Sequence, residues 1–305
     1  MKPVVSSNRR RFLFAGAAAL GGVGVRAAQP FGRTDRSRLR LSLAAYSFRD
    51  AFKTAKGAVA GAAPRMDMLK FVDYCAEHGC DGAELTSYFF PPEVGADYLL
   101  KVRRRAFLSG VEVSGTAVGN NFSLPGVDAR AAQVAQVKRW IDHAAVLGAP
   151  HIRVFAGVAP KDFPREKADE AATAALRECC DYAAPKGIFL GLENHDSIGT
   201  AESLLRFVKA VDHPWFGLNL DTGNFRAADP YREMELTAPH AVNVQLKVEL
   251  SVEGRKAPTD VARVLRILRA ARYQGYVALE YEAAEDPFQA VPKVLRELKT
   301  SLAAG

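Results

Sequence analysis

Residues 187–196 read GIFLGLENHD, a stretch that begins like a buried strand and ends in polar side chains. Ile188, Leu190 and Leu192 share one parity, whereas Glu193 belongs to the other. Side chains alternate between the two faces of a strand. We therefore expect one aliphatic face packed under helices, and a carboxylate on the opposite face near the carboxyl end of the strand.

Seven further runs of this kind recur along the chain, with amphipathic segments between most of them. Two of these segments, 130–148 and 165–187, end at Gly, which suits the left-handed end of a helix. Strands alternating with helices predict a parallel sheet covered by helices. Eight such units predict a (β/α)8 TIM barrel, α/β in class, as a single domain over residues 40–303. The expected strand runs are 41–48, 80–86, 110–117, 151–157, 187–194, 215–223, 240–248 and 275–282.

Residues 1–27 have the pattern of an export signal that precedes the barrel domain. Arg9 and Arg10 are followed by Phe12 and Leu13, and then by an apolar run that ends in small residues. This resembles a twin-arginine signal peptide. We expect a periplasmic or other extracytoplasmic protein. The apolar run is short for a membrane span, so no stable membrane insertion is expected after cleavage.

The charge and the cysteines exclude other classes of protein. The formal net charge of +7 falls to +2 when the five basic residues of 1–27 are removed, so nucleic acid is not an expected partner. Four cysteines without a Cys-x-x-Cys pair predict neither a disulfide scaffold nor a thiolate zinc site, and we interpret them as apolar packing. Whether the chain forms a homo-oligomer stays open.

Polar residues recur on the inward parity at the ends of four late strands. They are Glu193, Asp221, Gln245 and Glu280. Burying three carboxylates together is costly unless positive charge compensates them. Arg153 and Lys247 could do so, but a divalent cation binds several oxygens at once. Carboxylate and amide oxygens suit Mg²⁺ or Mn²⁺, so the pattern predicts one such ion held by these four residues.

The order LENH, LDTGN, VQLKV and LEYE, with HIRVFAG before it, resembles the sugar phosphate isomerase/epimerase family of xylose-isomerase-like barrels. That family holds its metal with a Glu, an Asp, a His and a Glu after strands five to eight. Glu193, Asp221 and Glu280 match, and Gln245 stands where the His is usual. The resemblance covers about residues 40–300. It implies a metal-dependent isomerase or epimerase acting on a free sugar or keto-sugar.

The mechanism implied by the resemblance is proton transfer beside a carbonyl, through an enediolate that the metal stabilises. Glu193 and Glu280, on opposite sides of the barrel mouth, would act as base and acid. Asn224 stands where the family often has a second His, three residues after its Asp. The residues expected to bind the small carbohydrate substrate are His195, Arg153, Lys247, Glu84 and Asn224.

Aromatic residues are expected on loops over the predicted mouth. Sugar rings stack on aromatic faces through their C–H groups, but part of this set should only pack in the core. The set is Tyr46, Phe48, Tyr88, Phe89, Phe90, Phe122 and Phe225.

Other functions stay open. The same enolising chemistry could expel a β-leaving group, which would make the chain a lyase or hydrolase that cleaves the glycosidic bond of a keto-glycoside. A non-catalytic sugar-binding barrel is favoured by Gln245 and Asn224 and disfavoured by the three carboxylates. An apurinic-site endonuclease shares the barrel, but it needs a cluster of metals and many histidines, and this chain has six.

Overall fold

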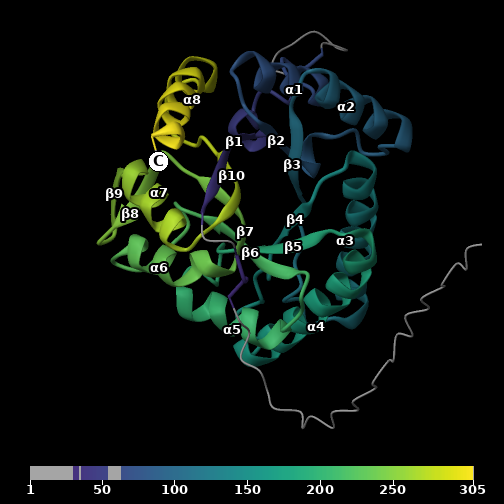
Figure 1. Ribbon diagram of the computed structural model, residues 1–305. Coiled ribbons are helices and arrows are strands. Elements are labelled where there is room, and N and C mark those ends of the chain that lie inside the picture. Colours follow the sequence, from purple (N-terminus) through teal and green to yellow (C-terminus); the bar gives the residue numbers. More distant parts are fainter. Residues whose placement is uncertain (1–29, 34–35, 54–62, 305) are drawn as a thin grey trace, which may run out of the picture.

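The structure, a computed structural model, describes residues 30–33, 36–53 and 63–304. Eight parallel strands close into a barrel in the order β1-β10-β7-β6-β5-β4-β3-β2, which confirms the predicted TIM barrel (Figure 1). The expected export signal, residues 1–27, lies outside the described residues. The barrel strands are β1 (Arg38–Ala44), β2 (Gly82–Thr86), β3 (Glu112–Ala117), β4 (His151–Val154), β5 (Phe189–Glu193), β6 (Phe216–Asp221), β7 (Ala241–Leu246) and β10 (Gln274–Leu279).

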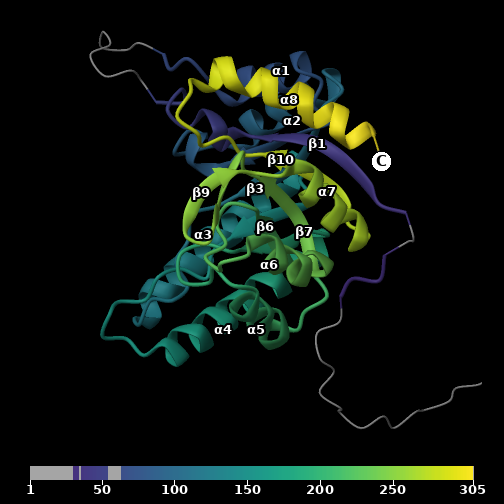
Figure 2. The same cartoon turned by 90° about the vertical axis from the view of Figure 1, so that its left-hand side faces the viewer.

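Within the described residues, eight α-helices surround the barrel. The last helix lies beside the first and closes the ring, with the rings of Phe288 and Tyr74 6.2 Å apart (Figure 2). None of the described helices is both long and apolar enough to cross a membrane. The helices are α1 (Met68–Glu77), α2 (Ala96–Leu108), α3 (Val127–Leu147), α4 (Arg165–Ala183), α5 (Ala201–Val211), α6 (Pro230–Thr237), α7 (Val261–Ala270) and α8 (Pro287–Ala303).

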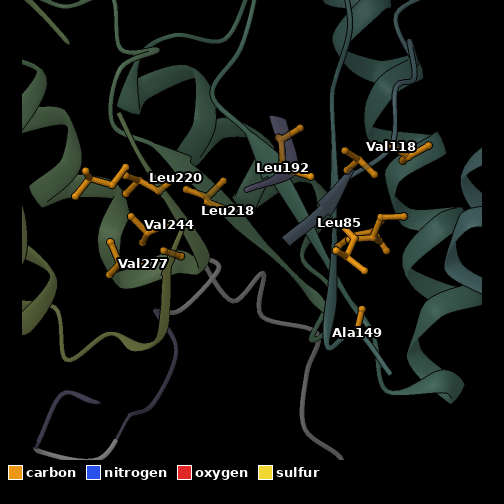
Figure 3. Packing of buried hydrophobic residues seen from close by; sticks show 14 of the residues in the cluster. Leu85, Val118, Ala149, Leu192, Leu218, Leu220, Val244 and Val277 are labelled. Carbon is orange, nitrogen blue, oxygen red and sulfur yellow. The ribbon is translucent and has the colours of Figure 1, made fainter. Parts of the chain in front are cut away.

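The core lies between the barrel wall and the helices. Leu190 and Leu192 of β5 are fully buried, as their parity predicts. The same outward face on β6, β7 and β10 carries Leu218, Val244 and Val277 (Figure 3). Each fully buried aliphatic side chain stabilises the fold by about 1.5–3 kcal/mol. The four cysteines are free and buried, which confirms that they serve as packing.

The helix ends follow the sequence signals. Gly148 ends α3 with a φ of 78°, and its left-handed conformation confirms the expected stop. The segment 165–187 also reaches a left-handed Gly187, but α4 ends at Ala183 and a 3-10 turn fills the gap. Asp229 caps α6 by accepting from the backbone N–H groups two and three residues on.

The first strand run is shorter than predicted. The expected strand 41–48 stops at Ala44, and Ala45–Phe48 form a 3-10 turn. Ser47 Oγ donates to the carbonyl of Leu279 at 3.2 Å and accepts from the N–H of Tyr281 at 2.9 Å. These bonds tie the turn to the end of β10, because a buried hydroxyl requires partners. The loop after β1 is thereby fixed at the barrel mouth.

A hairpin that the sequence reasoning did not predict follows β7. It pairs β8 (Glu249–Val252) with antiparallel β9 (Arg255–Pro258), beside α6 and α7 (Figure 1). Glu253 and Gly254 form its two-residue turn with φ of 50° and 75°, the positive values that such hairpin turns require. The hairpin stands outside the closed barrel.

The opposite end of the barrel is covered by residues 30–33. The Phe31 ring meets Phe189, at the start of β5, edge-on at 5.8 Å. Its backbone N–H donates to the carbonyl of Pro239 at 3.2 Å. The Arg33 guanidinium donates to the carbonyl of Ala241, at the start of β7. The segment that follows the expected signal therefore contacts the end of the barrel away from the polar strand ends.

Candidate active site

Three carboxylates and one amide lie near the carboxyl ends of late barrel strands. Glu193 and Asp221 are the last residues of β5 and β6, Gln245 is the penultimate residue of β7, and Glu280 follows β10 directly. Their exposed fractions are only 5%, 0%, 2% and 6%. Buried carboxylates at this density need positive charge or protons to be stable.

The Glu193 carboxylate has two partners. Arg153 on the neighbouring strand β4 places its Nε 2.8 Å from Oε2, and both side chains are about 6% exposed. Asn224 Nδ2 donates to Oε1 at 2.9 Å. Burial raises the pKa of Glu193 to about 7, while the charge of Arg153 acts in the opposite direction. A carboxyl group with such a pKa can both accept and release a proton near neutral pH.

Asp221 is fixed mainly by backbone groups. Its Oδ1 accepts from the N–H groups of Gly223 at 2.8 Å and Asn224 at 3.1 Å. The side-chain amide of Asn194 donates to the carbonyl of Asp221 and accepts from its N–H, each at 2.8 Å. Oδ2 lies 3.2 Å from Lys247 Nζ, but no donor among the described residues is aligned to hydrogen-bond it. Burial raises the pKa of Asp221, and Lys247 opposes that rise.

Of the three acids, Glu280 has the fewest hydrogen-bond and ion-pair partners among the described residues. Its backbone N–H donates to the carbonyl of Leu246 at 2.9 Å, which sets it beside β7. Within the described part of the chain its carboxylate makes no hydrogen bond or ion pair. Burial raises its pKa well above the ordinary value; Lys247 opposes this rise, whereas Asp221 and Glu193 add to it.

Lys247 links the acids to the rim of the mouth. Its Nζ lies 3.2 Å from Asp221, donates to Asn224 Oδ1 at 3.4 Å and contacts Glu282. Burial lowers its pKa, but the carboxylates around it raise that pKa above the ordinary value. Glu282 also lies 3.9 Å from Arg49. Glu282 was not predicted as a site residue, although it shares the parity of Glu280.

Below the acids, a polar layer crosses the barrel interior. Glu84 on β2 accepts from Asn243 Nδ2 and from Gln245 Nε2 on β7, each at 2.6 Å. Asn219 on β6 donates to Gln245 Oε1 at 2.6 Å and accepts from Asn243 at 2.7 Å. Strands β2 and β7 are not neighbours, so these bonds pass through the interior, and the four side chains face the axis. Burial raises the pKa of Glu84, and the amide donors oppose this.

The five expected substrate contacts fall into three places. Arg153, Lys247 and Asn224 contact the carboxylates directly. Glu84 lies in the polar layer below them. The His195 side chain is 40% exposed, lies 2.9 Å from Asp196 and packs on Phe155 with ring centroids 4.7 Å apart. It therefore stands at the rim of the site.

Most of the expected aromatic side chains pack instead of lining the site. Phe48, Phe90, Phe122 and Phe225 are no more than 6% exposed. Tyr88 is 45% exposed, and its hydroxyl accepts from Arg153 Nη1 at 3.2 Å. Tyr88 therefore reaches the charged cluster through this hydrogen bond.

A divalent cation fits this cluster in charge and in donor type. Glu84, Glu193, Asp221 and Glu280 outnumber the buried Arg153 and the partly buried Lys247, and within the described residues no donor is aligned to hydrogen-bond Asp221 Oδ2. Oxygen donors of this kind suit Mg²⁺ or Mn²⁺. Over residues 30–33, 36–53 and 63–304, no three or more His, Cys, Asp or Glu are arranged to hold a metal ion. Gln245 would have to give up its bond from Asn219 to become a ligand, so the four-residue metal set stays a prediction.

Two curated proteins are similar in sequence. A 3-oxo-isoapionate decarboxylase of Pectobacterium atrosepticum is 26% identical over 184 residues, 60% of this chain and 61% of that protein. The L-ribulose-5-phosphate 3-epimerase UlaE of Escherichia coli is 29% identical over 139 residues, 42% of this chain and 49% of that protein. The matches thus span about half to three fifths of these relatives.

Solved structures share the fold at low identity. The 3-keto-D-glucoside 4-epimerase YcjR of E. coli has a TM-score of 0.64 and 20% identity, with 87% of this chain and all of that chain covered. The IOLI protein, solved with a zinc atom, has a TM-score of 0.67 and 15% identity over 86% of this chain and 96% of that chain. The profile of the xylose isomerase-like TIM barrel family matches residues 72–299, which is most of the chain. The chain belongs to this family.

Proposed function

We propose that this protein is a sugar isomerase or epimerase that moves a proton at the carbon beside a carbonyl. The observation that carries the proposal is the position of two buried carboxylates. Glu193 ends β5 and Glu280 follows β10, and two strands separate β5 from β10 around the mouth. A planar enediolate between them would have one carboxyl group on each face. A two-base epimerisation uses this arrangement, because the proton leaves one face and returns to the other.

The charged neighbours have complementary roles in this proposal. Arg153 and Lys247 would donate hydrogen bonds to the substrate oxygens and compensate the negative charge that develops in the enediolate. Asn224 hydrogen-bonds both Glu193 and Lys247, so it would fix the position of the base relative to that cation. The burial of these groups excludes water, which strengthens each interaction.

The proposal includes one divalent ion, Mn²⁺ or Mg²⁺. Glu193, Asp221 and Glu280 are the carboxylates that would hold it, with Gln245 as a fourth ligand if its amide is released from Asn219. When bound, the ion would polarise the substrate carbonyl as a Lewis acid. The zinc atom in the IOLI structure supports a divalent ion at this site, and the epimerase names among the relatives support the reaction.

The experiment is a panel of free keto-sugars and keto-glycosides incubated with the protein and Mn²⁺ in D2O, followed by NMR. Deuterium should enter beside the carbonyl, and an epimer or isomer should accumulate. Glu280→Gln should lower the accumulation of the epimer by about 10²–10⁴-fold, the usual contribution of a general acid or base. The matched control is Glu285→Gln, since Glu285 is an exposed carboxylate near the same strand end that pairs with Lys293.

Product analysis separates the alternatives. Release of a free sugar or aglycone from a keto-glycoside would identify the lyase or hydrolase. Sugar binding without exchange, and with no metal bound, would identify a non-catalytic barrel. Formation of the epimer at the wild-type rate in Glu280→Gln would remove Glu280 from the chemistry.

We also propose that the protein is exported through the twin-arginine route, on the basis of residues 1–27. Replacing Arg9 and Arg10 with Lys should retain the protein in the cytoplasm, where fractionation and blotting would find it. Normal export of this variant would contradict the assignment of the route.

A further inference from the structure

Two carboxylates of the segment after β10 are candidates to pair with Lys247. Glu280 follows the strand directly, and Glu282 stands two residues later. The Lys247 ammonium group contacts Glu282, and it also lies 3.2 Å from Asp221 Oδ2 and donates to Asn224 Oδ1 at 3.4 Å. Among the described residues, no ion pair joins it to Glu280. Lys247 is therefore paired with the outer of the two carboxylates, and Glu280 is left without a partner.

The base of the Lys247 side chain is fixed more firmly than its tip. The backbone N–H of Lys247 donates to Thr222 Oγ1 at 2.9 Å, and its carbonyl accepts from Thr259 Oγ1 at 2.6 Å. Its stem passes over Gly223, where an added Cβ would lie 2.7 Å from Lys247 Cδ. Beyond this point a lysine side chain is a flexible four-carbon stem. The position of the ammonium group therefore depends on the oxygen atoms around it.

Glu282 lies on the outer side of that ammonium group. The Glu282 side chain is 30% exposed, compared with 15% for Lys247 and 0% for Asp221. Arg49 lies 3.9 Å from the Glu282 carboxylate and donates to the carbonyl of Tyr281 at 3.5 Å, so the loop after β1 contacts this carboxylate too. Lys247 and Glu282 both line a cavity of about 180 Å³. A lysine released from Glu282 would therefore have space to reorient.

We propose that Glu282 is a positioning residue for the proposed reaction: it holds Lys247 against Asp221 and away from Glu280. This rests on the proposed function and adds to it a residue that acts through Lys247. An ion pair between Lys247 and Glu280 would occupy the carboxylate that has to reach the substrate, and it would withdraw the ammonium group from the substrate oxygens. Both groups have to be in place for proton transfer, because a displacement of about 1 Å can cost about 10²-fold in rate.

The test is a double-mutant cycle on kcat for epimer formation by the Mn²⁺-loaded protein, with the keto-sugar that reacts fastest. Glu282→Gln keeps the length of the side chain and removes its charge, so it should lower kcat by about tenfold or more. In the Lys247→Met background the same substitution should change kcat by less than about twofold, because the group on which Glu282 acts is gone. A purely structural role for Glu282 would lower kcat equally in both backgrounds.

Glu285→Gln is the matched control, since Glu285 is a 53% exposed carboxylate close to the same strand end that pairs with Lys293. It should leave kcat unchanged in both backgrounds. Equal losses from Glu282→Gln in the two backgrounds, or no loss in the wild-type background, would overturn the positioning role and leave the isomerase proposal intact.

Absence of turnover in the wild type would refute the proposed function itself. In that case, or if Lys247→Met has no measurable turnover, the cycle is read from urea denaturation in the presence of EDTA. A Lys247–Glu282 coupling larger than that of the exposed Lys293–Glu285 pair would support the hold of Glu282 on Lys247, and an equal or smaller coupling would overturn it.

Discussion

The Arg153–Glu193 pair gives the sharpest prediction about stability. Arg153→Met keeps most of the side-chain length but leaves the Glu193 carboxylate, 5% exposed, without its ion-pair partner at 2.8 Å. Breaking a buried pair by removing one member costs about 3–5 kcal/mol, because the remaining charge is buried and unpaired. We therefore expect the metal-free variant to lose about that much of its free energy of unfolding.

The assay is urea denaturation at pH 9 in the presence of EDTA, followed by circular dichroism. Glu193 is ionised at this pH in the wild type, because its pKa is about 7. Arg165→Met is the matched control. Arg165 also pairs with a carboxylate, Asp169 at 2.7 Å, but its side chain is 42% exposed. An exposed pair contributes about 0–1 kcal/mol. The double variant Arg153→Met/Glu193→Gln should recover most of the loss, since no unpaired charge remains. A loss below about 1 kcal/mol in Arg153→Met, or no recovery in the double variant, would refute the reasoning.

Three further predictions follow from the same interior. Burial raises the pKa of Glu193 from 4.5 to about 7, so the folded metal-free protein binds this proton more tightly than the unfolded chain. The free energy of unfolding should therefore fall as the pH rises from 4.5 to 7. In urea titrations at pH 5 and 8, Glu193→Gln should reduce this dependence on pH. Gly115→Ala should destabilise the fold by about 1–3 kcal/mol in the same assay, because a Cβ there would lie 1.9 Å from the buried His151 ring, and a wild-type midpoint would contradict this packing. Metal analysis after dialysis against Mn²⁺ should find about one ion per chain, with a raised melting temperature that Asp221→Asn abolishes; an unchanged melting temperature would argue against the metal.

Strand periodicity was sufficient to predict the barrel and the strand ends that carry its acids. Leu190 and Leu192 alternate with Glu193, and an alternating pattern of this kind determines which face each side chain takes. The same rule placed Asp221 and Gln245. These predictions depend only on the alternation of side chains along a single strand, which can be read from the sequence.

Contacts across the barrel could not be predicted in the same way. Glu84 and Gln245 are 161 residues apart and bond through the interior, which depends on the size and register of the closed sheet. Parity predicted that Gln245 faces inward, but not that its amide bonds Asn219. Tyr88 was one of several loop aromatics, and its link to Arg153 follows from how the loop after β2 folds over the mouth.

The hairpin after β7 was not predicted, because its turn sequence is a weak hairpin signal. Residues 249–258 read ELSVEGRKAP, with Glu253 and Gly254 at the turn. Glu-Gly is not one of the Asn-Gly, Asp-Gly or Gly-Gly pairs that most strongly predict a two-residue hairpin turn. The expectation that a helix follows each strand of a barrel also argued against a hairpin here.

The central claim is that Glu193 and Glu280 act on opposite faces of one enediolate. The most direct measurement is deuterium exchange of each member of an epimeric keto-sugar pair by the two single variants, Glu193→Gln and Glu280→Gln. Neither variant should interconvert the epimers, and each should still exchange the proton of one epimer, a different one in each case. Loss of exchange from the same epimer in both variants, or interconversion at the wild-type rate in either, would contradict the claim.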